Sequence, residues 1–137
     1  MVTLEQFRYC PTHSTHPPFC YDFHYVKPGM VAIFGDNGSG KSTLAQLMAG
    51  WYPDFLPGEI TGTGTLLGTP IGRLPLNEQS ATIQLVQQSP YLQLSGCTFS
   101  VEEEVAFGPE NLCLAEKEIM ARIDAALALT ECQPEVV

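Results

Sequence analysis

Apolar and aromatic residues in the first third of the chain are spaced in a way that predicts strands. LEQFRY (4–9) and FCYDFHYV (19–26) are rich in aromatic residues, and a loop with three prolines separates them. Aromatic-rich runs bounded by such loops are typical of strands. VAIF (31–34) is a short apolar run that ends at Gly35, which predicts a buried third strand.

The pattern then changes from strand to helix and back. STLAQLMAG (42–50) has one apolar helical face, formed by Leu44, Leu47 and Met48. GEITGTGTLLG (58–68) alternates threonine with glycine or leucine, the two-residue period of a half-buried strand. SATIQLVQ (80–87) is apolar enough to predict a further strand.

Two helices are predicted in the C-terminal third. SVEEEVAFG (100–108) opens with a helix-capping serine and has glutamate three positions later, the pattern of a capping box. LAEKEIMARIDAALALTEC (114–132) has an apolar face in helical register, formed by Ile119, Ile123, Ala126 and Leu127. A chain of 137 residues with this order of elements fits one compact domain.

The charge is concentrated near the C-terminus. From Glu102 onward nine acidic residues stand against two basic ones, so this stretch carries −7 of the formal net charge of −9. An acidic surface repels nucleic-acid phosphates and anionic lipid. No apolar run approaches the roughly 18 residues needed to cross a bilayer. We therefore expect neither nucleic-acid binding nor direct membrane insertion.

Cysteine and histidine offer little sign of a metal or disulfide framework. The opening MVTLEQFRY lacks the basic and apolar segments of a secretion signal, so the five irregularly spaced cysteines are expected to be reduced thiols. Zinc-type ligands do occur at short spacing, at Cys10, His13, His16 and Cys20. Their spacing is not that of a standard zinc finger, and we favour an ordinary loop.

The chemistry is carried by GDNGSGKST (35–43). Gly35-x4-Gly40-Lys41-Ser42 matches the phosphate-loop pattern G-x-x-x-x-G-K-[ST]. Glycines let successive backbone N–H groups converge on one anion, and the helix that follows adds its positive N-terminal end. Lys41 is placed to reach the outer phosphates, and the Ser42 hydroxyl to bind Mg²⁺. The alternative is a glycine-rich turn that matches by chance, but the predicted strand before it and helix after it favour nucleoside-triphosphate binding.

A longer comparison of motifs points to one family. GDNGSGKSTLAQLMAG (35–50) resembles the Walker A loop of ATP-binding cassette (ABC) proteins, and DNA-maintenance ATPases share part of it. VQQSPYLQLSGCTFSVEEEVAFGPENL (86–112) resembles the Q-loop region of ABC transporters, most of all the energy-coupling factor and cobalt/vitamin importer ATPases. Ser100 stands here where those proteins have threonine.

The resemblance implies a fold and a division of the chain. It implies an α/β P-loop NTPase core with an N-terminal antiparallel β-subdomain and the beginning of an α-helical subdomain, truncated. Residues 1–99 would form the nucleotide-binding core with the Q-loop, and residues 100–137 the start of the helical subdomain.

The resemblance also implies roles for individual residues. Gln88 would be the Q-loop glutamine that contacts Mg²⁺ or the attacking water, with Gln87 and Gln93 as alternatives. Tyr9 would stack on the adenine, with Phe7 as the alternative. Lys41 and Gln88 would be the catalytic residues, and Ser42 and Gln88 the metal ligands. The phosphate cradle would consist of Asn37, Gly38, Ser39, Gly40, Lys41, Ser42 and Thr43.

Several parts that the family needs for hydrolysis are not found after Leu112: an LSGGQ signature, an apolar strand ending in Asp-Glu, and a switch histidine. LSGC (94–97) lacks the second glycine and the glutamine of the signature. Glu102, Glu103 and Glu104 follow no apolar strand and are better explained as favourable charges at a helix N-terminus. We expect this chain to bind ATP with Mg²⁺ and not to hydrolyse it alone.

The resemblance implies that the chain would be the ATP-binding subunit of an energy-coupling-factor-like importer for a vitamin or metal ion. It would lie on the cytoplasmic face of the membrane as a peripheral protein. Its partners would be transmembrane transporter subunits, docked near residues 88–107, and a second cassette in a homo- or heterodimer. Two alternatives stay open: a DNA-maintenance P-loop ATPase, and a nucleotide-binding fragment with only an interaction role.

Overall fold

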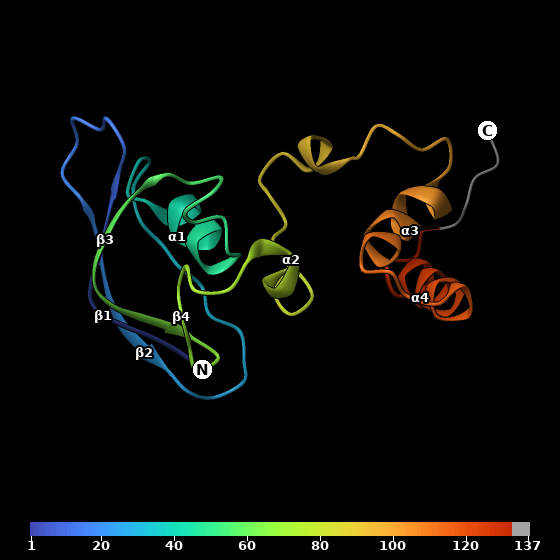
Figure 1. The fold of residues 1–137 in the computed structure, drawn as a ribbon, viewed down its shortest axis with the longest axis horizontal. Helices are drawn as coiled ribbons and strands as arrows, with labels where there is room; N and C mark the ends of the chain where they lie inside the picture. Colours follow the sequence, from blue (N-terminus) through green and yellow to red (C-terminus); the bar gives the residue numbers. More distant parts are fainter. Residues whose placement is uncertain (133–137) are drawn as a thin grey trace. The chain divides into compact units, whose positions relative to one another are not determined.

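The computed structural model describes residues 1–132. The chain divides into two compact units, Met1–Leu85 and a second that begins at Val86. The sequence placed the division between residues 99 and 100. The two units are described separately below (Figure 1).

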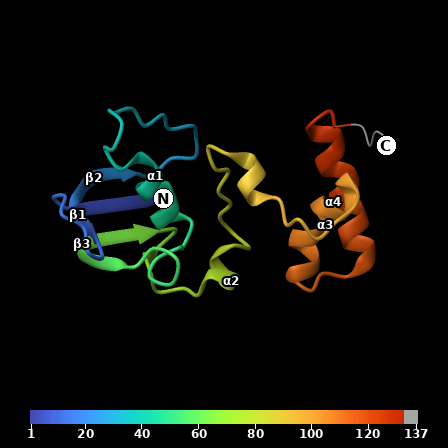
Figure 2. The same cartoon turned by 90° about the horizontal axis from the view of Figure 1, so that it is seen from above.

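The first unit is built on a four-stranded antiparallel sheet of order β2-β1-β3-β4. Its strands are β1 (Val2–Pro11), β2 (Phe19–Tyr25), β3 (Gly58–Leu66) and the short β4 (Thr69–Pro70). The helix α1 (Lys41–Met48) lies against one face of this sheet in both views (Figures 1 and 2). The strands predicted at 4–9, 19–26 and 58–68 and the helix predicted at 42–50 are confirmed.

A β-bulge in β1 decides which residues face α1. The pairing register shifts between Leu4 and Phe7, and Gln6 within the shift has a φ of 45°. An extra residue in one strand reverses the alternation of faces beyond it. Leu4, Phe7 and Tyr9 therefore all point to the same side, where they form the buried core with Leu44 and Leu47 of α1.

The C-terminal end of α1 is held by a buried amide. The short helix α2 (Leu76–Gln79) places the Gln79 side chain against the end of α1. Its Nε2 donates a hydrogen bond of 2.6 Å to the carbonyl oxygen of Met48, one of the carbonyls that a helix cannot satisfy internally. Gly50, with a φ of +85°, gives the chain the sharp exit that the predicted glycine stop requires.

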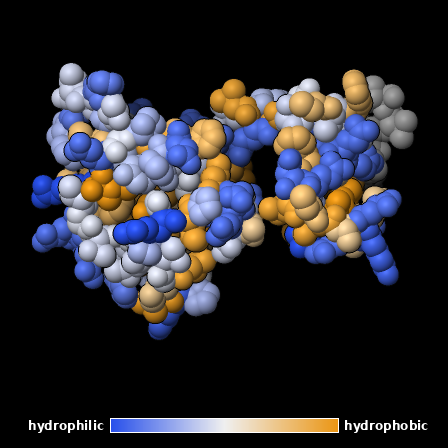
Figure 3. Space-filling view, in the orientation of Figure 1, coloured by the Kyte–Doolittle hydropathy of each residue, from blue (hydrophilic) through white to orange (hydrophobic). Residues whose placement is uncertain are grey.

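Two predicted strands are wrong. Residues 31–34 and 80–87 form no strand, and Phe34 is 90% exposed and Val86 83% exposed. An apolar strand buried on both faces needs hydrogen-bonded neighbours in a sheet. In residues 1–132 the one sheet consists of the four antiparallel strands above, and neither segment joins it. Apolar residues remain at the surface in Figure 3, where they are orange.

The second unit contains the 3₁₀ turn η1 (Pro90–Gln93) and the helices α3 (Val101–Asn111) and α4 (Glu116–Leu129). The two α-helices pack against each other. The predicted apolar face of α4 is confirmed, because Ile123 is buried and its predicted neighbours are the half-buried residues of the helix. The predicted cap is confirmed too, since Ser100 Oγ accepts the Glu103 N–H at 3.2 Å. The Glu103 carboxylate accepts the N–H of Phe99, at 2.7 Å.

Glu104 fixes the segment that leads into α3. Its carboxylate accepts the N–H of Ser95 at 2.6 Å, the Ser95 hydroxyl at 2.8 Å and the Thr98 hydroxyl at 2.6 Å. The hydrogen bond from Thr98, followed by those from Ser95, holds the pKa of Glu104 below its usual value. Glu104 therefore binds its own loop in addition to favouring the helix N-terminus.

Gly62 should tolerate no side chain. Its φ is +82°, and an added Cβ would lie 2.2 Å from the carbonyl oxygen of Gln6 in the bulge. We expect Gly62→Ala to lower the free energy of unfolding by at least about 2 kcal/mol, from backbone strain plus a backbone clash. Gly68→Ala is the matched control, since Gly68 has a φ of +87° and open space around it. Denaturant unfolding that gave equal losses for both would contradict the packing described for the bulge.

The contacts of Glu104 predict a pH effect. Because its pKa is lowered, the Glu104 carboxylate stabilises the fold at pH values above the ordinary glutamate pKa. This stabilisation is lost as the pH falls through the lowered pKa. A ¹³C NMR titration of the Glu104 carboxyl should give a pKa below the ordinary glutamate value, and Thr98→Val should raise that pKa. Thr130→Val removes a hydroxyl that instead donates to Ala126 at 2.8 Å and should leave the Glu104 pKa unchanged; a shift of equal size there would refute the assignment.

Candidate functional site

The glycine-rich loop joins residue 34 to the start of α1. Residues 35–39 are exposed, whereas Gly40 is buried. Gly38 and Gly40 have φ values of 81° and 90°, in the left-handed region that other residues seldom adopt. The N–H of Ser39 donates to the carbonyl of Asp36 at 3.2 Å, which closes a turn. The backbone thus wraps tightly here, and the binding of phosphate by this loop stays a prediction.

The ammonium group of Lys41 lies inside this wrap. Nζ donates to the carbonyl oxygens of Gly35 and Asp36, both at 2.7 Å, and to Ser39 Oγ at 3.3 Å. These are uncharged oxygen acceptors, and no ion pair of Lys41 with a carboxylate is found in residues 1–132. The positive charge is therefore available to an incoming anion.

The N-terminus of α1 adds to this charge. The helix begins at Lys41, and its first turn contains no acidic residue. The first N–H groups of a helix have no acceptor within the helix, and they carry the positive end of its dipole. The first helical hydrogen bond runs from Leu44 N–H to the carbonyl of Gly40, at 2.8 Å. The N–H groups before it have no acceptor within the helix.

The residues present fit a phosphate and a magnesium ion. An exposed loop with left-handed glycines, free helical N–H groups and an ammonium group are the donors that a phosphate chain requires. The Ser42 side chain is exposed at the helix start, where its hydroxyl can bind Mg²⁺. In residues 1–132 no group of three or more His, Cys, Asp or Glu is placed to hold a metal, so such an ion would need oxygens from its ligand.

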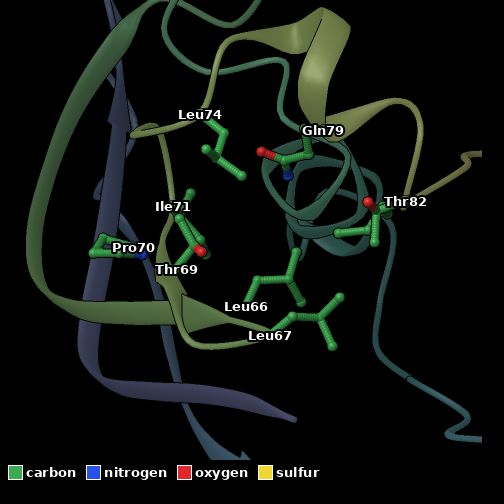
Figure 4. Close-up of a pocket in the computed structure, with 9 residues that line it drawn as sticks. Leu66, Leu67, Thr69, Pro70, Ile71, Leu74, Gln79 and Thr82 are labelled. Carbon is green, nitrogen blue, oxygen red and sulfur yellow. The ribbon is translucent and has the colours of Figure 1, made fainter.

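Two of the cavities of the first unit bear on a ligand site. One, of about 500 Å³, is lined by residues 20–25 of β2, by Val31, Ile33 and Phe34, and by residues of the loop and α1 that include Gly35, Ser39 and Lys41. The other, of about 160 Å³, is lined by Gln79 and mostly apolar side chains such as Leu66, Ile71 and Leu74 (Figure 4). It is below the roughly 300 Å³ of a typical ligand site. The larger cavity is the one that adjoins the phosphate loop.

Tyr9 does not lie where an adenine could stack on it. Its ring is fully buried in the core, and its hydroxyl donates to the carbonyls of Pro57 at 2.9 Å and Leu56 at 3.3 Å. The bulge in β1 is the physical cause, because it turns Tyr9 inward together with Leu4 and Phe7. Phe7, the alternative, is buried in the same cluster.

The other predicted residues fall into two groups. The seven cradle residues are contiguous and lie together at the loop and the start of α1. Gln88 belongs to the second unit and is exposed, so its role stays a prediction. Gln93, one of its alternatives, accepts the N–H of Gln87 through Oε1 at 2.8 Å.

Sequence reasoning missed a contact from β2. The hydroxyl of Tyr21 donates to the carbonyl of Gly40 at 2.8 Å. Burial, followed by the neighbouring Cys20 and Tyr9, raises the pKa of Tyr21 to about 12, so this hydroxyl remains a donor at neutral pH. No motif marks this residue. The inward face of the predicted strand was the one available signal.

Comparison with known proteins decides the family. The model of the family described as "ABC transporter" matches residues 21–137. The chain belongs to the ABC transporter family. Its fold class is therefore that of the P-loop NTPases, as the sequence predicted, with the antiparallel sheet and helices described above.

Individual ABC relatives cover most of this chain. A protein of Methanosarcina mazei named as an ABC transporter ATP-binding protein is 39% identical over 93% of this chain and 44% of its own length. One from Streptomyces coelicolor is 40% identical over 78% of the chain and 36% of its own length. The energy-coupling factor transporter ATP-binding protein EcfA1 of Levilactobacillus brevis is 44% identical over 72% of the chain and 33% of its own length.

The ABC chain thus spans less than half the length of these curated relatives. Within residues 1–132, none of the helices has the length and apolar character needed to cross a membrane.

The position of Tyr9 gives a test of adenine recognition. Tyr9→Leu should lower the free energy of unfolding by about 2 kcal/mol, because it removes buried ring contacts and a buried hydroxyl. It should leave the ratio of the affinities for ATP and inorganic triphosphate unchanged. Adenine stacking is worth about 1–3 kcal/mol per base, so calorimetry showing a tenfold fall in that ratio would restore the stacking role. Tyr91→Leu, at an exposed tyrosine, is the control.

Proposed function

We propose that this ABC chain is the ATP-binding part of a transporter ATPase, and that residues 35–43 hold the phosphates of ATP with Mg²⁺. The observation that supports this proposal is the position of the Lys41 ammonium: Lys41 is the first residue of α1, and its Nζ is hydrogen-bonded to uncharged oxygens. On binding, Nζ would exchange carbonyl acceptors for phosphate oxygens. A charged acceptor makes a stronger hydrogen bond with it than a neutral one.

Each cradle residue has a role in this proposal. Gly38 and Gly40 give the backbone the left-handed turns that let N–H groups converge. Ser42 would bind Mg²⁺, and that ion would neutralise charge on the phosphates. Asn37 and Ser39 belong to the exposed loop, and Thr43 is a half-buried residue of the first turn of α1. Gln88 would contact Mg²⁺ or the attacking water, as the resemblance to the Q-loop implies.

Hydrolysis is assigned to a larger assembly. Rate in phosphoryl transfer comes from positioned groups and charge stabilisation in addition to the phosphate cradle. The carboxylates of Glu103 and Glu104 bind Phe99, Ser95 and Thr98, which supports a structural role for them and not that of a general base. We infer that this chain alone binds ATP without turning it over.

The finer proposal is an importer of the energy-coupling-factor type. The VEEEVAFG block (101–108) supports it, as does the identity with the EcfA1 protein. The transported substrate would then be a vitamin or a metal ion. The chain would act as a peripheral protein at the cytoplasmic face of the membrane, with transmembrane subunits and a second cassette as partners.

A surface for the transmembrane partner is supported by exposure in the second unit. Phe99 is 100% exposed and Tyr91 84% exposed, and both lie in the predicted docking region 88–107. Exposed aromatic side chains are enriched at protein interfaces. A membrane subunit docked on this segment would cover these two side chains.

Lys41→Ala tests the proposed function directly. It removes the ammonium from the loop and should weaken Mg²⁺-dependent ATP binding at least tenfold, since a hydrogen bond to a charged group is worth about 1.5–3 kcal/mol. Lys27→Ala makes the same charge change at an exposed lysine outside the loop and should bind as the parent does. Isothermal calorimetry on both variants, with thermal unfolding to confirm that each is folded, gives the comparison. Equal affinities for the two variants would refute the proposal.

A further inference from the structure

The strand β2 contacts the phosphate loop at Gly40. The Tyr21 hydroxyl donates to the Gly40 carbonyl at 2.8 Å. A Cβ added to Gly40 would lie 2.6 Å from both Tyr21 Oη and Phe19 Cδ1. Gly40 is the one buried residue of the otherwise exposed stretch 35–40. The sheet therefore contacts the loop at the residue that directly precedes α1.

The carbonyl that Tyr21 binds has a second partner. It also accepts the N–H of Leu44 at 2.8 Å, the first hydrogen bond of α1. A carbonyl oxygen has two lone pairs and can accept both bonds. Two donors from different elements fix its direction more strictly than either would alone.

The direction of that carbonyl determines the direction of an N–H group in the cradle. A trans peptide is planar, with its C=O and N–H pointing to opposite sides. The carbonyl of Gly40 points to Tyr21 and into the helix, so the N–H of Lys41 in the same peptide points away from both. That N–H is one of the free donors at the N-terminus of α1.

We propose that Tyr21 is a positioning residue of the phosphate site: its hydroxyl orients the Gly40–Lys41 peptide, so that the Lys41 N–H and the helix N-terminus face the ligand. Its orienting effect is a property of the free chain, and its effect on affinity rests on the proposed function. Phe19 supports the same peptide by contact with the Gly40 backbone.

Tyr21→Phe removes the hydroxyl and keeps the ring. Tyr25→Phe is the matched control: Tyr25 lies on the same strand and the same inward face, and its hydroxyl has no hydrogen-bond partner in residues 1–132. The first measurement is the ¹⁵N chemical shift of Lys41 in the unliganded full chain. This shift responds to hydrogen bonding at the preceding carbonyl, so Tyr21→Phe should move it and Tyr25→Phe should not. An unmoved Lys41 resonance in folded Tyr21→Phe overturns the inference, whatever the chain binds.

The second measurement is affinity by calorimetry, for Mg²⁺·ATP and for pyrophosphate. Tyr21→Phe should weaken both about three- to tenfold, the effect of one hydrogen bond, while Tyr25→Phe should weaken neither. If the parent binds ATP and Tyr21→Phe binds it equally well, the positioning role is overturned and the proposed function stands. If the parent binds pyrophosphate but not ATP, the proposed function fails, and a weaker Tyr21→Phe still supports the inference. If the parent binds neither, both fail.

Discussion

The packing of Leu44 and Leu47 against the inward face of β1 fixes where α1 begins, and the phosphate loop depends on that position. Burying an aliphatic side chain of this size is worth about 1.5–3 kcal/mol, and both leucines lie in the core with Leu4, Phe7 and Tyr9. With its apolar face packed on the sheet, the helix is further oriented by contacts at both of its ends. Its N-terminus is held at Gly40, and its C-terminus meets the Gln79 amide.

The loop is exposed along residues 35–39 and held in place at Gly40. Its residues 35–39 are exposed and carry few contacts of their own besides those to the Lys41 ammonium. Gly40 is held by the hydrogen bond from the Tyr21 hydroxyl and by contact with the Phe19 ring. In such an arrangement the donors at the helix start are fixed before a ligand arrives, which lowers the entropic cost of binding.

The sequence predicted local structure well where a feature depends on near neighbours. The phosphate loop, the capping serine of α3 and the apolar face of α4 were all evident from residue spacing, because each depends on a few adjacent positions. The segments 31–34 and 80–87 were predicted as strands and are not strands. Their apolar content signals a preference for burial, whereas a strand also needs partner strands, which no local pattern can supply.

The candidate site was proposed from the sequence in part for the same reason, and its binding role stays a prediction. Its cradle residues are contiguous, and contiguity is visible in a sequence. Tyr9 was expected to stack on adenine because the resemblance gives only its distance in sequence from the loop. The bulge at Gln6, which turns Tyr9 into the core, has no clear local signal. Tyr21 is 19 residues from Gly40, and its contact exists because the antiparallel sheet folds back beside the loop. The place of Glu104 on a helix predicted a favourable charge at the helix N-terminus. Its hydrogen bonds to Ser95 and Thr98 became evident only in the structure.

We propose above all that backbone N–H groups at the start of α1 bind the phosphates of ATP. The most direct measurement is a series of ¹H–¹⁵N spectra of the chain titrated with Mg²⁺·ATP. We predict saturable shifts at the amides of residues 38–43, reproduced by ADP and much weaker with adenosine. Amides in this stretch that stay unmoved at saturating ATP, or shifts confined to other parts of the chain, would contradict the claim.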